Sequence, residues 1–274
     1  MQVMTSANKT NPVEGAERIV AVAHRLADAA RTETLNLFRS PALRPDNKSA
    51  TGFDPVTEAD RASERAMRAI LAVECPEDGI LGEEYGSRDG QSGLTWVLDP
   101  IDGTRAFMAG APSWGVLIGL SDAQGPVYGI VDQPHLDERF EGGLGRARLI
   151  SRHGTSPLRA RQGVALAEAT LMTTYPEVGS PAEHAAFSRV AARARLVRYG
   201  LDCYAYALLA AGHVDLVIEA GLQPYDVVAP IAVVQAAGGV VTDWQGGPAH
   251  GGGTILAAGS HELHAEALAL LKGD

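Results

Sequence analysis

Apolar residues recur every three or four positions in two segments near the N-terminus, a spacing that predicts amphipathic helices. The first segment runs from about residue 11 to residue 38, and Pro12 stands one position inside its start, where proline is favoured. The second begins at Thr57 and has an acid three residues later, Asp60, which is the pattern of a capping box. Pro76 closes this helix, because proline interrupts helical hydrogen bonding.

Between about residues 79 and 161 the pattern changes to short apolar runs separated by glycine and proline, which is typical of β-strands. The runs expected to form strands are 96–98, 115–120, 127–131 and 139–141. After about residue 167, strands and helices alternate. We expect strands at 171–174, 196–199, 214–219, 240–243 and 255–258, and helices at 181–195, 202–211, 225–237 and 261–271.

These two sequence patterns predict an α+β part over residues 1–161 and an α/β part over residues 162–274. We expect the two parts to pack as a single compact catalytic unit. With 274 residues, 46% of them hydrophobic, the chain can bury a substantial core. Its two cysteines, Cys75 and Cys203, are far apart in the sequence. We expect both to be reduced and buried rather than joined in a disulfide.

Charge and lysine content exclude several classes of partner. The net charge of −10, from 33 acidic and 23 basic residues, argues against a nucleic-acid-binding surface. None of the three lysines follows a glycine-rich loop, which excludes a P-loop. The first residues are polar, unlike a signal peptide, and no apolar run is long enough to span a membrane. We therefore expect a cytoplasmic protein with neither nucleic-acid nor membrane partners.

The segment 99–104 has the sequence Asp-Pro-Ile-Asp-Gly-Thr and directly follows the apolar run 96–98. This pattern predicts a strand that ends in a tight corner, after which Gly103 and Thr104 open a short helix. Two carboxylates at such a corner can hold a divalent cation, and the free N–H groups of a helix start attract anionic oxygen. The alternative is a plain turn, because Asp-Pro and Asp-Gly pairs are common in turns.

Three further acids stand at the ends of predicted elements, where small molecules can reach them. They are Asp54 before the second helix, Glu83 after the apolar pair 80–81, and Asp226 in the first turn of the helix 225–237. Each also has a purely structural interpretation, as a turn residue, a solvated corner and a helix N-terminal charge respectively. Their functional meaning therefore depends on the whole set.

Four motifs begin at residues 54, 82, 96 and 225: Asp-Pro-Val-Thr, Gly-Glu-Glu, Trp-Val-Leu-Asp-Pro-Ile-Asp-Gly-Thr and Tyr-Asp-Val. In this order they resemble the motifs of the inositol monophosphatase family of magnesium-dependent phosphomonoesterases. The resemblance covers nearly the whole chain, from about Gly15 to the C-terminal helix. It implies a layered αβαβα sandwich of the inositol monophosphatase and fructose-1,6-bisphosphatase type, which agrees with the two-part pattern above.

The resemblance also implies roles for individual residues. Two or three Mg²⁺ ions would be held by the side chains of Glu83, Asp99, Asp102 and Asp226 and by the backbone carbonyl of Ile101. Thr104, oriented by Asp54, would position and deprotonate the attacking water, and a weaker metal site would depend on Glu83. The N–H groups of Gly103 and Thr104 would hold the phosphate oxygens.

The proposed chemistry agrees with these residue types. Four crowded carboxylates repel one another unless divalent cations neutralise them. Such cations lower the pKa of a bound water and stabilise charge on the attacking and leaving oxygens. We therefore expect direct in-line attack by water, with no histidine base and no serine or cysteine nucleophile.

Three segments depart from the inositol enzymes and resemble the histidinol-phosphate phosphatases of the same family. Thr-Arg-Ala-Phe follows Gly103, Leu-Gln-Pro precedes Tyr225, and Leu-Asp-Cys-Tyr-Ala-Tyr occupies residues 201–206. The resemblance implies hydrolysis of L-histidinol phosphate, a step of histidine biosynthesis.

A charge argument favours the same substrate. Glu219 matches the position that meets the non-phosphate part of the substrate in the inositol enzymes, and Asp202 stands where those enzymes have a small neutral residue. Two acids suit the ammonium and imidazole groups of histidinol phosphate better than neutral inositol. Alternatively, Asp202 could cap the following helix, and Arg105 could form a surface ion pair instead of contacting substrate. Tyr204 and Tyr206 could stack on the imidazole, although their spacing favours one of them lying in the core.

Two other functions remain compatible with the sequence. One is a phosphatase for inositol 1-phosphate or another small phosphate ester. The other is a partner-binding protein with the family fold and vestigial catalysis, which the intact set of acids disfavours. From the resemblance we also expect a homodimer that acts on a small-molecule phosphate ester.

Overall fold

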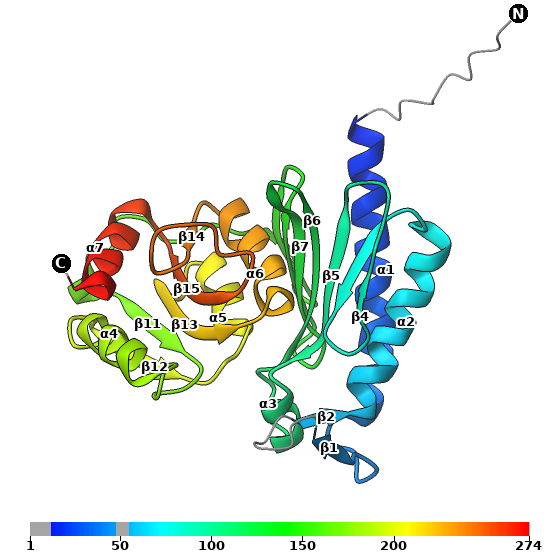
Figure 1. Cartoon of the computed structure of the whole chain (residues 1–274), viewed down its shortest axis with the longest axis horizontal. Coiled ribbons are helices and arrows are strands. Elements are labelled where there is room, and N and C mark those ends of the chain that lie inside the picture. The colour runs from blue at the N-terminus through cyan, green and yellow to red at the C-terminus, as the bar shows by residue number, and fades with distance from the viewer. Residues whose placement is uncertain (1–11, 48–54, 274) are drawn as a thin grey trace, which may run out of the picture.

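The computed structural model describes residues 12–47 and 55–273. Two β-sheets alternate with three layers of helices (Figure 1). Helices α1 (Pro12–Leu37) and α2 (Glu58–Glu74) form one outer layer, α5 (Tyr204–Ala210) and α6 (Pro224–Ala236) lie between the sheets, and α4 (Pro181–Ala191) and α7 (His261–Lys272) form the other outer layer. The predicted layered αβαβα sandwich is confirmed.

The larger sheet has eight strands in the order β10-β9-β8-β7-β6-β5-β3-β4. Only the β3–β5 pair is parallel. Successive residues of its central strands face opposite sides, so that Leu117 packs toward α5 and α6 while Ile118 packs toward α1 and α2. The strands are β3 (Gly79–Gly82), β4 (Gly86–Arg88), β5 (Thr95–Asp102), β6 (Gly115–Asp122), β7 (Gly125–Gln133), β8 (Glu138–Gly143), β9 (Arg146–Ser151) and β10 (Gly154–Pro157).

Helix α6 lies in a groove that three glycines open across the larger sheet. Gly119, Gly129 and Gly142 stand on the neighbouring strands β6, β7 and β8. A Cβ atom on Gly129 would lie 2.4 Å from the carbonyl oxygen of Ala229, and one on Gly142 would lie 2.4 Å from a Cα atom of the same helix. Only glycine permits this close approach of helix backbone to sheet. The groove therefore fixes where α6, and Asp226 at its start, can lie.

The smaller sheet has the order β12-β11-β13-β15-β14, with α4 and α7 on its outer face. Its strands are β11 (Thr170–Thr173), β12 (Leu196–Tyr199), β13 (Leu216–Leu222), β14 (Val240–Thr242) and β15 (Gly253–Ala258). The remaining elements of the described residues are the helix α3 (Thr104–Ala109), a two-stranded ladder of β1 (Pro45–Asn47) and β2 (Pro55–Thr57), and the 3₁₀ turn η1 (Leu166–Glu168).

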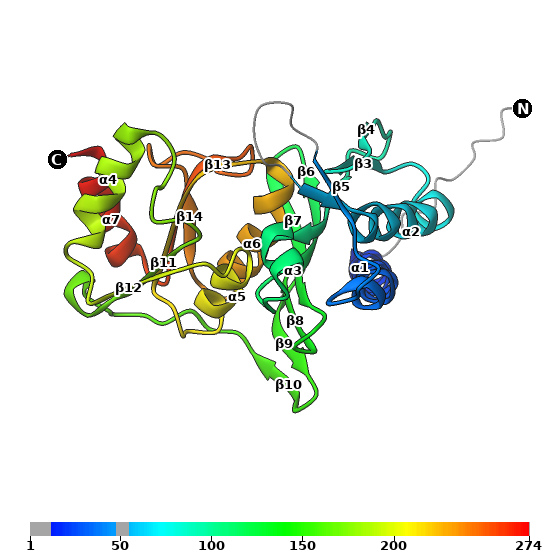
Figure 2. The same ribbon diagram turned by 90° about the horizontal axis from the view of Figure 1, so that it is seen from below.

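Several predicted boundaries need correction. The helix expected at 181–195 ends at Ala191, and the one expected at 202–211 begins only at Tyr204. The strand expected at 214–219 covers Leu216–Leu222. The hairpin β9–β10 was missed, because its residues are half-buried or exposed and lack an apolar run; it projects from the edge of the sheet (Figure 2). The short strands β1, β2 and β4 were also missed.

Other expectations are confirmed. Thr57 and Asp60 form the predicted capping box, in which the backbone N–H of Thr57 donates to Asp60 Oδ2 at 2.8 Å. Cys75 and Cys203 are both unpaired and buried. Within the described ranges, every helix is too short or too polar to cross a membrane.

Candidate active site

The two acids of segment 99–104 stand at the end of β5, where the ladder with β6 is irregular. Asp99 pairs with Leu117 and Asp102 with Gly115, so the register shifts between the two acids. The backbone N–H of Ile101 donates to Asp99 Oδ1 at 3.0 Å, which holds the chain in this irregular turn. The shift lets residues three apart direct their carboxylates toward one place.

Asp226 completes this group from the second half of the chain. It is the third residue of α6, and the backbone N–H of Gln223 donates to its Oδ2 atom at 2.7 Å. Carboxylate oxygens of Asp99, Asp102 and Asp226 all lie within 4.8 Å of one another. The sequence prediction that brings these three acids together therefore agrees with the fold, although they come from two distant parts of the chain.

The energetics of this acid group indicate a cation site. Burial raises the pKa of Asp99 well above its usual range, and the carboxylates of Glu83, Asp102 and Asp226 raise it further. Burial likewise raises the pKa of Asp226, to about 6. The strongest charges acting on Asp99 are thus all negative. A donor set made only of carboxylate oxygens fits a hard divalent cation such as Mg²⁺, because such a cation would relieve this repulsion.

Glu83 reaches the same place from the neighbouring strand. It follows β3, and its backbone N–H donates to the Leu98 carbonyl at 3.1 Å. The turn that carries it is held by Glu64 of α2, a fully buried acid that sequence reasoning missed. Glu64 accepts hydrogen bonds from the backbone N–H groups of Glu84 at 2.7 Å and Tyr85 at 3.2 Å. The only signal in the sequence was an acid within the buried side of an amphipathic helix.

The corner itself has the predicted form. Gly103 adopts a left-handed conformation with φ of 84°, and α3 (Thr104–Ala109) begins directly after it. A Cβ atom on Gly103 would lie 2.8 Å from Cγ of Asp202, so glycine is required for space as well as conformation. The Thr104 hydroxyl donates to the carbonyl oxygen of Ile101 at 3.1 Å, which joins two of the predicted site atoms to each other. Asp54 lies outside the described residues.

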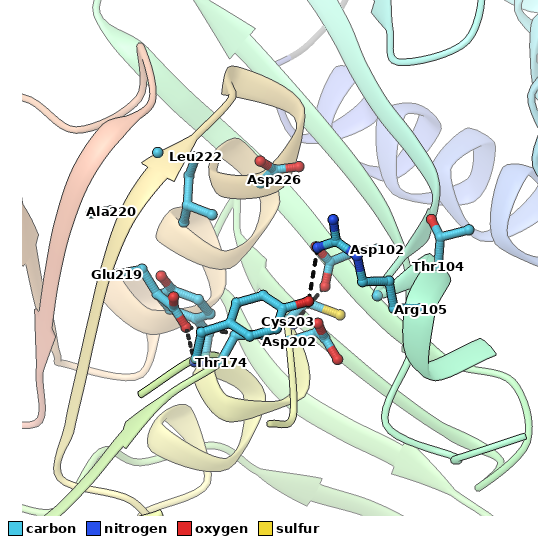
Figure 3. Close-up of a pocket in the computed structure, with 14 residues that line it drawn as sticks. Asp102, Thr104, Arg105, Thr174, Asp202, Cys203, Glu219, Ala220, Leu222 and Asp226 are labelled. Atoms are coloured by element: carbon cyan, nitrogen blue, oxygen red, sulfur yellow. Dashed lines mark hydrogen bonds between the residues drawn. The ribbon is translucent and has the colours of Figure 1, made fainter. Parts of the chain in front are cut away.

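A cavity of about 280 Å³ extends from this corner between the two halves (Figure 3). Figure 3 shows Asp102 and Asp226 apart from Glu219. The cavity brings together many of the predicted residues but not Glu83, Asp99 or Ile101. Its lining comprises Asp102, Gly103, Thr104, Arg105, Thr174, Tyr175, Asp202, Cys203, Tyr206, Glu219, Ala220, Gly221, Leu222 and Asp226.

The two acids expected to face the substrate both line this cavity. Glu219 is 7% exposed and accepts hydrogen bonds from the N–H and hydroxyl of Thr174, at 2.8 and 2.9 Å. Burial raises its pKa to about 7 despite these bonds. Burial also raises the pKa of Asp202, to about 6, although Arg105 opposes the shift. The alternative in which Asp202 caps α5 is wrong, because Cys203 is the capping residue. The backbone N–H of Cys203 donates instead to Asp102 Oδ2 at 2.6 Å.

The structure also bears on the alternatives left open for Arg105, Tyr204 and Tyr206. Arg105 Nη1 donates to the hydroxyl of Tyr175 at 2.8 Å, and its guanidinium lies 5.6 Å from the centre of that ring. This contact joins α3 to the loop after β11 at the cavity (Figure 3). Tyr204 donates to Glu138 Oε2 at 2.7 Å and does not line the cavity, whereas Tyr206 does. No sequence signal had indicated Thr174 or Tyr175.

Comparison with known proteins identifies the family of this chain. The sequence model of the inositol monophosphatase family matches residues 16–272. The chain belongs to the inositol monophosphatase family. Its acid group and cavity are therefore those of a phosphatase family whose members are generally magnesium-dependent and act on small phosphate esters.

Relatives within the family differ in the substrate that their names state. The chain is 39% identical over 267 residues to a bifunctional chloroplastic phosphatase, IMPL2, of Arabidopsis thaliana, covering 93% of this chain and 75% of the relative. It is 35% identical over 258 residues to a histidinol-phosphatase of Mycobacterium tuberculosis, covering 90% and 95%. The solved structure of an inositol monophosphatase from Zymomonas mobilis matches with a TM-score of 0.81 and 41% identity, covering 93% and 98%.

Proposed function

We propose that this protein is a Mg²⁺-dependent phosphatase that hydrolyses L-histidinol phosphate to L-histidinol and inorganic phosphate. The observation that carries the proposal is a single cavity with two acidic ends. Asp102 and Asp226 belong to the cation site at one end, and Asp202 and Glu219 line the part beyond it. Histidinol-phosphatases among its relatives support the same substrate.

The second pair of acids matters because of the charge of the ester. Histidinol phosphate carries an ammonium group and an imidazole that is partly protonated near neutral pH. A cationic group next to Glu219 and Asp202 would favour their ionised forms, which burial alone disfavours. Inositol offers only neutral hydroxyls at this position and would leave these buried charges uncompensated.

We assign the cation to the carboxylates of Asp99, Asp102, Asp226 and Glu83, with the carbonyl of Ile101 as a further ligand. Bound Mg²⁺ would supply Lewis acidity, which lowers the pKa of water and neutralises charge on the transferred phosphoryl group. Thr104, with Asp54, would orient the attacking water once its hydroxyl turns from the Ile101 carbonyl. The backbone N–H groups of Gly103 and Thr104 would hold phosphate oxygens while the water oxygen bonds to phosphorus and the ester P–O bond breaks.

Phosphate release from three esters tests the proposal. L-Histidinol phosphate, inositol 1-phosphate and adenosine 3′,5′-bisphosphate are compared at equal concentration, with Mg²⁺ and with EDTA. We expect a Mg²⁺-dependent preference for histidinol phosphate of at least about tenfold in kcat/KM, since an uncompensated buried charge is costly. A preference for either other ester would retain the cation site and overturn the substrate.

One observation favours a second substrate. The inositol monophosphatase of Zymomonas mobilis shares both fold and 41% of its residues with this chain, which makes inositol 1-phosphate the leading alternative. No release from any ester would instead favour the partner-binding protein with vestigial catalysis. The homodimer, the cytoplasmic location and the place in histidine biosynthesis stay predictions.

A further inference from the structure

The cavity wall contains a buried hydroxyl group that has no hydrogen-bond partner among the described residues. It belongs to Tyr206 on α5, which is 4% exposed and lines the cavity beside Asp202 and Glu219. A buried hydroxyl without a partner lowers stability, so native proteins rarely retain one without a reason. A phenylalanine would fill the same space without this loss. The hydroxyl therefore needs an explanation outside the packing of the chain.

The charges around this hydroxyl indicate what kind of group would bind it. Burial raises the pKa of the Tyr206 phenol, and the carboxylates of Glu219, Asp102 and Asp226 raise it further. The phenol therefore stays neutral, with unused lone pairs in a strongly negative surrounding. Such a surrounding attracts a cationic N–H donor and disfavours another anionic acceptor.

We propose that Tyr206 is a specificity-determining residue whose hydroxyl oxygen accepts a hydrogen bond from the cationic amine part of the phosphate ester. Glu219 and Asp202 supply the charge for that part of the ester, and Tyr206 supplies a neutral, directional acceptor beside them. The inference rests on the proposed histidinol-phosphate function, since inositol carries no cationic group. An ester without any donor at this position, such as ethyl phosphate, leaves the hydroxyl unpaired and gains nothing from it.

Tyr204 on the same helix provides a matched comparison. Its hydroxyl donates to Glu138 Oε2 at 2.7 Å, and its ring lies edge-on to Phe140 with centroids 6.0 Å apart. The bond is within the protein and away from the cavity. Tyr204→Phe therefore removes a hydroxyl from the same helix that already has a partner within the protein and does not line the cavity.

The experiment compares Tyr206→Phe and Tyr204→Phe with the unaltered protein on three esters. L-Histidinol phosphate and ethanolamine phosphate both carry an ammonium group two carbons from the ester oxygen, and ethyl phosphate has none. For Tyr206→Phe we expect kcat/KM to fall about tenfold for the two cationic esters, through KM, and to change less than about twofold for ethyl phosphate. Tyr204→Phe should leave the ratio between esters unchanged. The Tm of Tyr206→Phe should not fall, because an unpaired hydroxyl is removed.

The possible failures are distinguishable. If the unaltered protein prefers histidinol phosphate but Tyr206→Phe leaves that preference intact, the role of Tyr206 is wrong and the proposed function stands. Equal losses on all three esters, or a lowered Tm, would assign Tyr206 a structural role and also overturn the inference. If the unaltered protein shows no preference for cationic esters over ethyl phosphate, the proposed function fails and the inference fails with it.

Discussion

At the scale of single residues, Asp99 shows how a site for a cation can work against the stability of the chain that forms it. Its carboxylate is 2% exposed and lies beside those of Glu83, Asp102 and Asp226. Without a cation, the folded state favours the protonated acid while the unfolded state ionises it freely. Functional sites commonly contain such destabilising groups.

We therefore predict opposite effects of Asp99→Asn on activity and stability. Activity with Mg²⁺ should fall by more than about a hundredfold, because a direct ligand is lost. The free energy of unfolding in EDTA should rise by about 1–3 kcal/mol, because a buried like charge is removed. Steady-state kinetics and denaturant unfolding measure the two effects. Near-normal turnover would remove Asp99 from the site.

The same carboxylates determine whether the free energy of unfolding rises or falls with pH. This pH dependence is the control for the prediction on Asp99→Asn. A carboxyl whose pKa is raised on folding, such as Asp226 at about 6, binds more protons in the folded than in the unfolded state. Its stabilising contribution is complete below the unfolded pKa and is lost as the pH rises through about 6. In EDTA, stability should therefore fall from pH 5 to pH 7 more steeply in the unaltered protein than in Asp99→Asn. A steeper fall in the variant would contradict this origin.

The sequence predicted the chemistry of the site better than its surroundings. Asp99, Asp102 and Asp226 carry the pattern of an acid at an element end, and the fold places them together. Thr174 belongs to a segment whose composition is ordinary for a strand end, and the sequence named Tyr204 and Tyr206 without deciding which of them lines the cavity. Their roles depend on which side chain finds a partner in three dimensions, which no local pattern encodes.

At the scale of elements, α2 acts as a clamp for the turn that carries Glu83. Glu64 joins the helix to that turn through two backbone N–H groups, and Arg68 Nε donates to Glu64 at 2.7 Å. The position of Glu83 next to Asp99 therefore depends on a side chain that does not line the cavity. Glu64 is a positioning residue in this sense.

We predict that Glu64→Gln weakens the use of Mg²⁺ more than it alters the maximal rate. The amide keeps one acceptor but loses charge, so the turn is held less firmly and the Mg²⁺ concentration for half-maximal activity should rise about tenfold. Stability should fall by about 1–3 kcal/mol. Mg²⁺ titrations of activity and thermal unfolding measure both.

Glu58→Gln on the same helix serves as the control. It breaks an exposed ion pair with Arg65 and should change stability by less than about 1 kcal/mol. An unchanged Mg²⁺ requirement in Glu64→Gln would exclude the clamp.

Helices and strands could be predicted from the sequence wherever one buried side produces a periodic pattern of apolar residues. Buried strands such as β6 and the helices α1 and α7 have apolar patterns that specify their type. The residues of the β9–β10 hairpin are half-buried or exposed throughout, so its sequence carries no such period. Helix α4 ends at Ala191, four residues before its predicted end, with Ala192 as its C-cap residue, although the following residues remain compatible with a helix.

At the scale of the whole molecule, α6 connects the two sheets. Its residues from Val227 to Val234 are all buried, so no face of the helix is left for solvent. On the larger sheet it covers Leu117, Val131 and Phe140, which belong to one core cluster with residues of the smaller sheet such as Val217. The two halves therefore share a core.

We predict that residues 1–157, which end with β10, do not form a stable fold alone. Without α6 the fragment exposes the apolar face and the glycine groove, and such surfaces aggregate. Sedimentation and thermal unfolding should show aggregates and no cooperative transition, whereas co-expression with residues 158–274 should restore both a defined complex and Mg²⁺-dependent activity. A monomeric fragment that unfolds cooperatively would show that the halves are independent domains.

The glycine groove also determines when the protein becomes active during its synthesis. Residues 119, 129 and 142 leave the ribosome well before α6, and so do the acids at the end of β5. A nascent chain therefore carries an uncovered groove and an incomplete cation site until Asp226 and its helix have emerged. The same docking event covers the groove and completes the acid group, so the cation site is incomplete in a chain that has not finished folding.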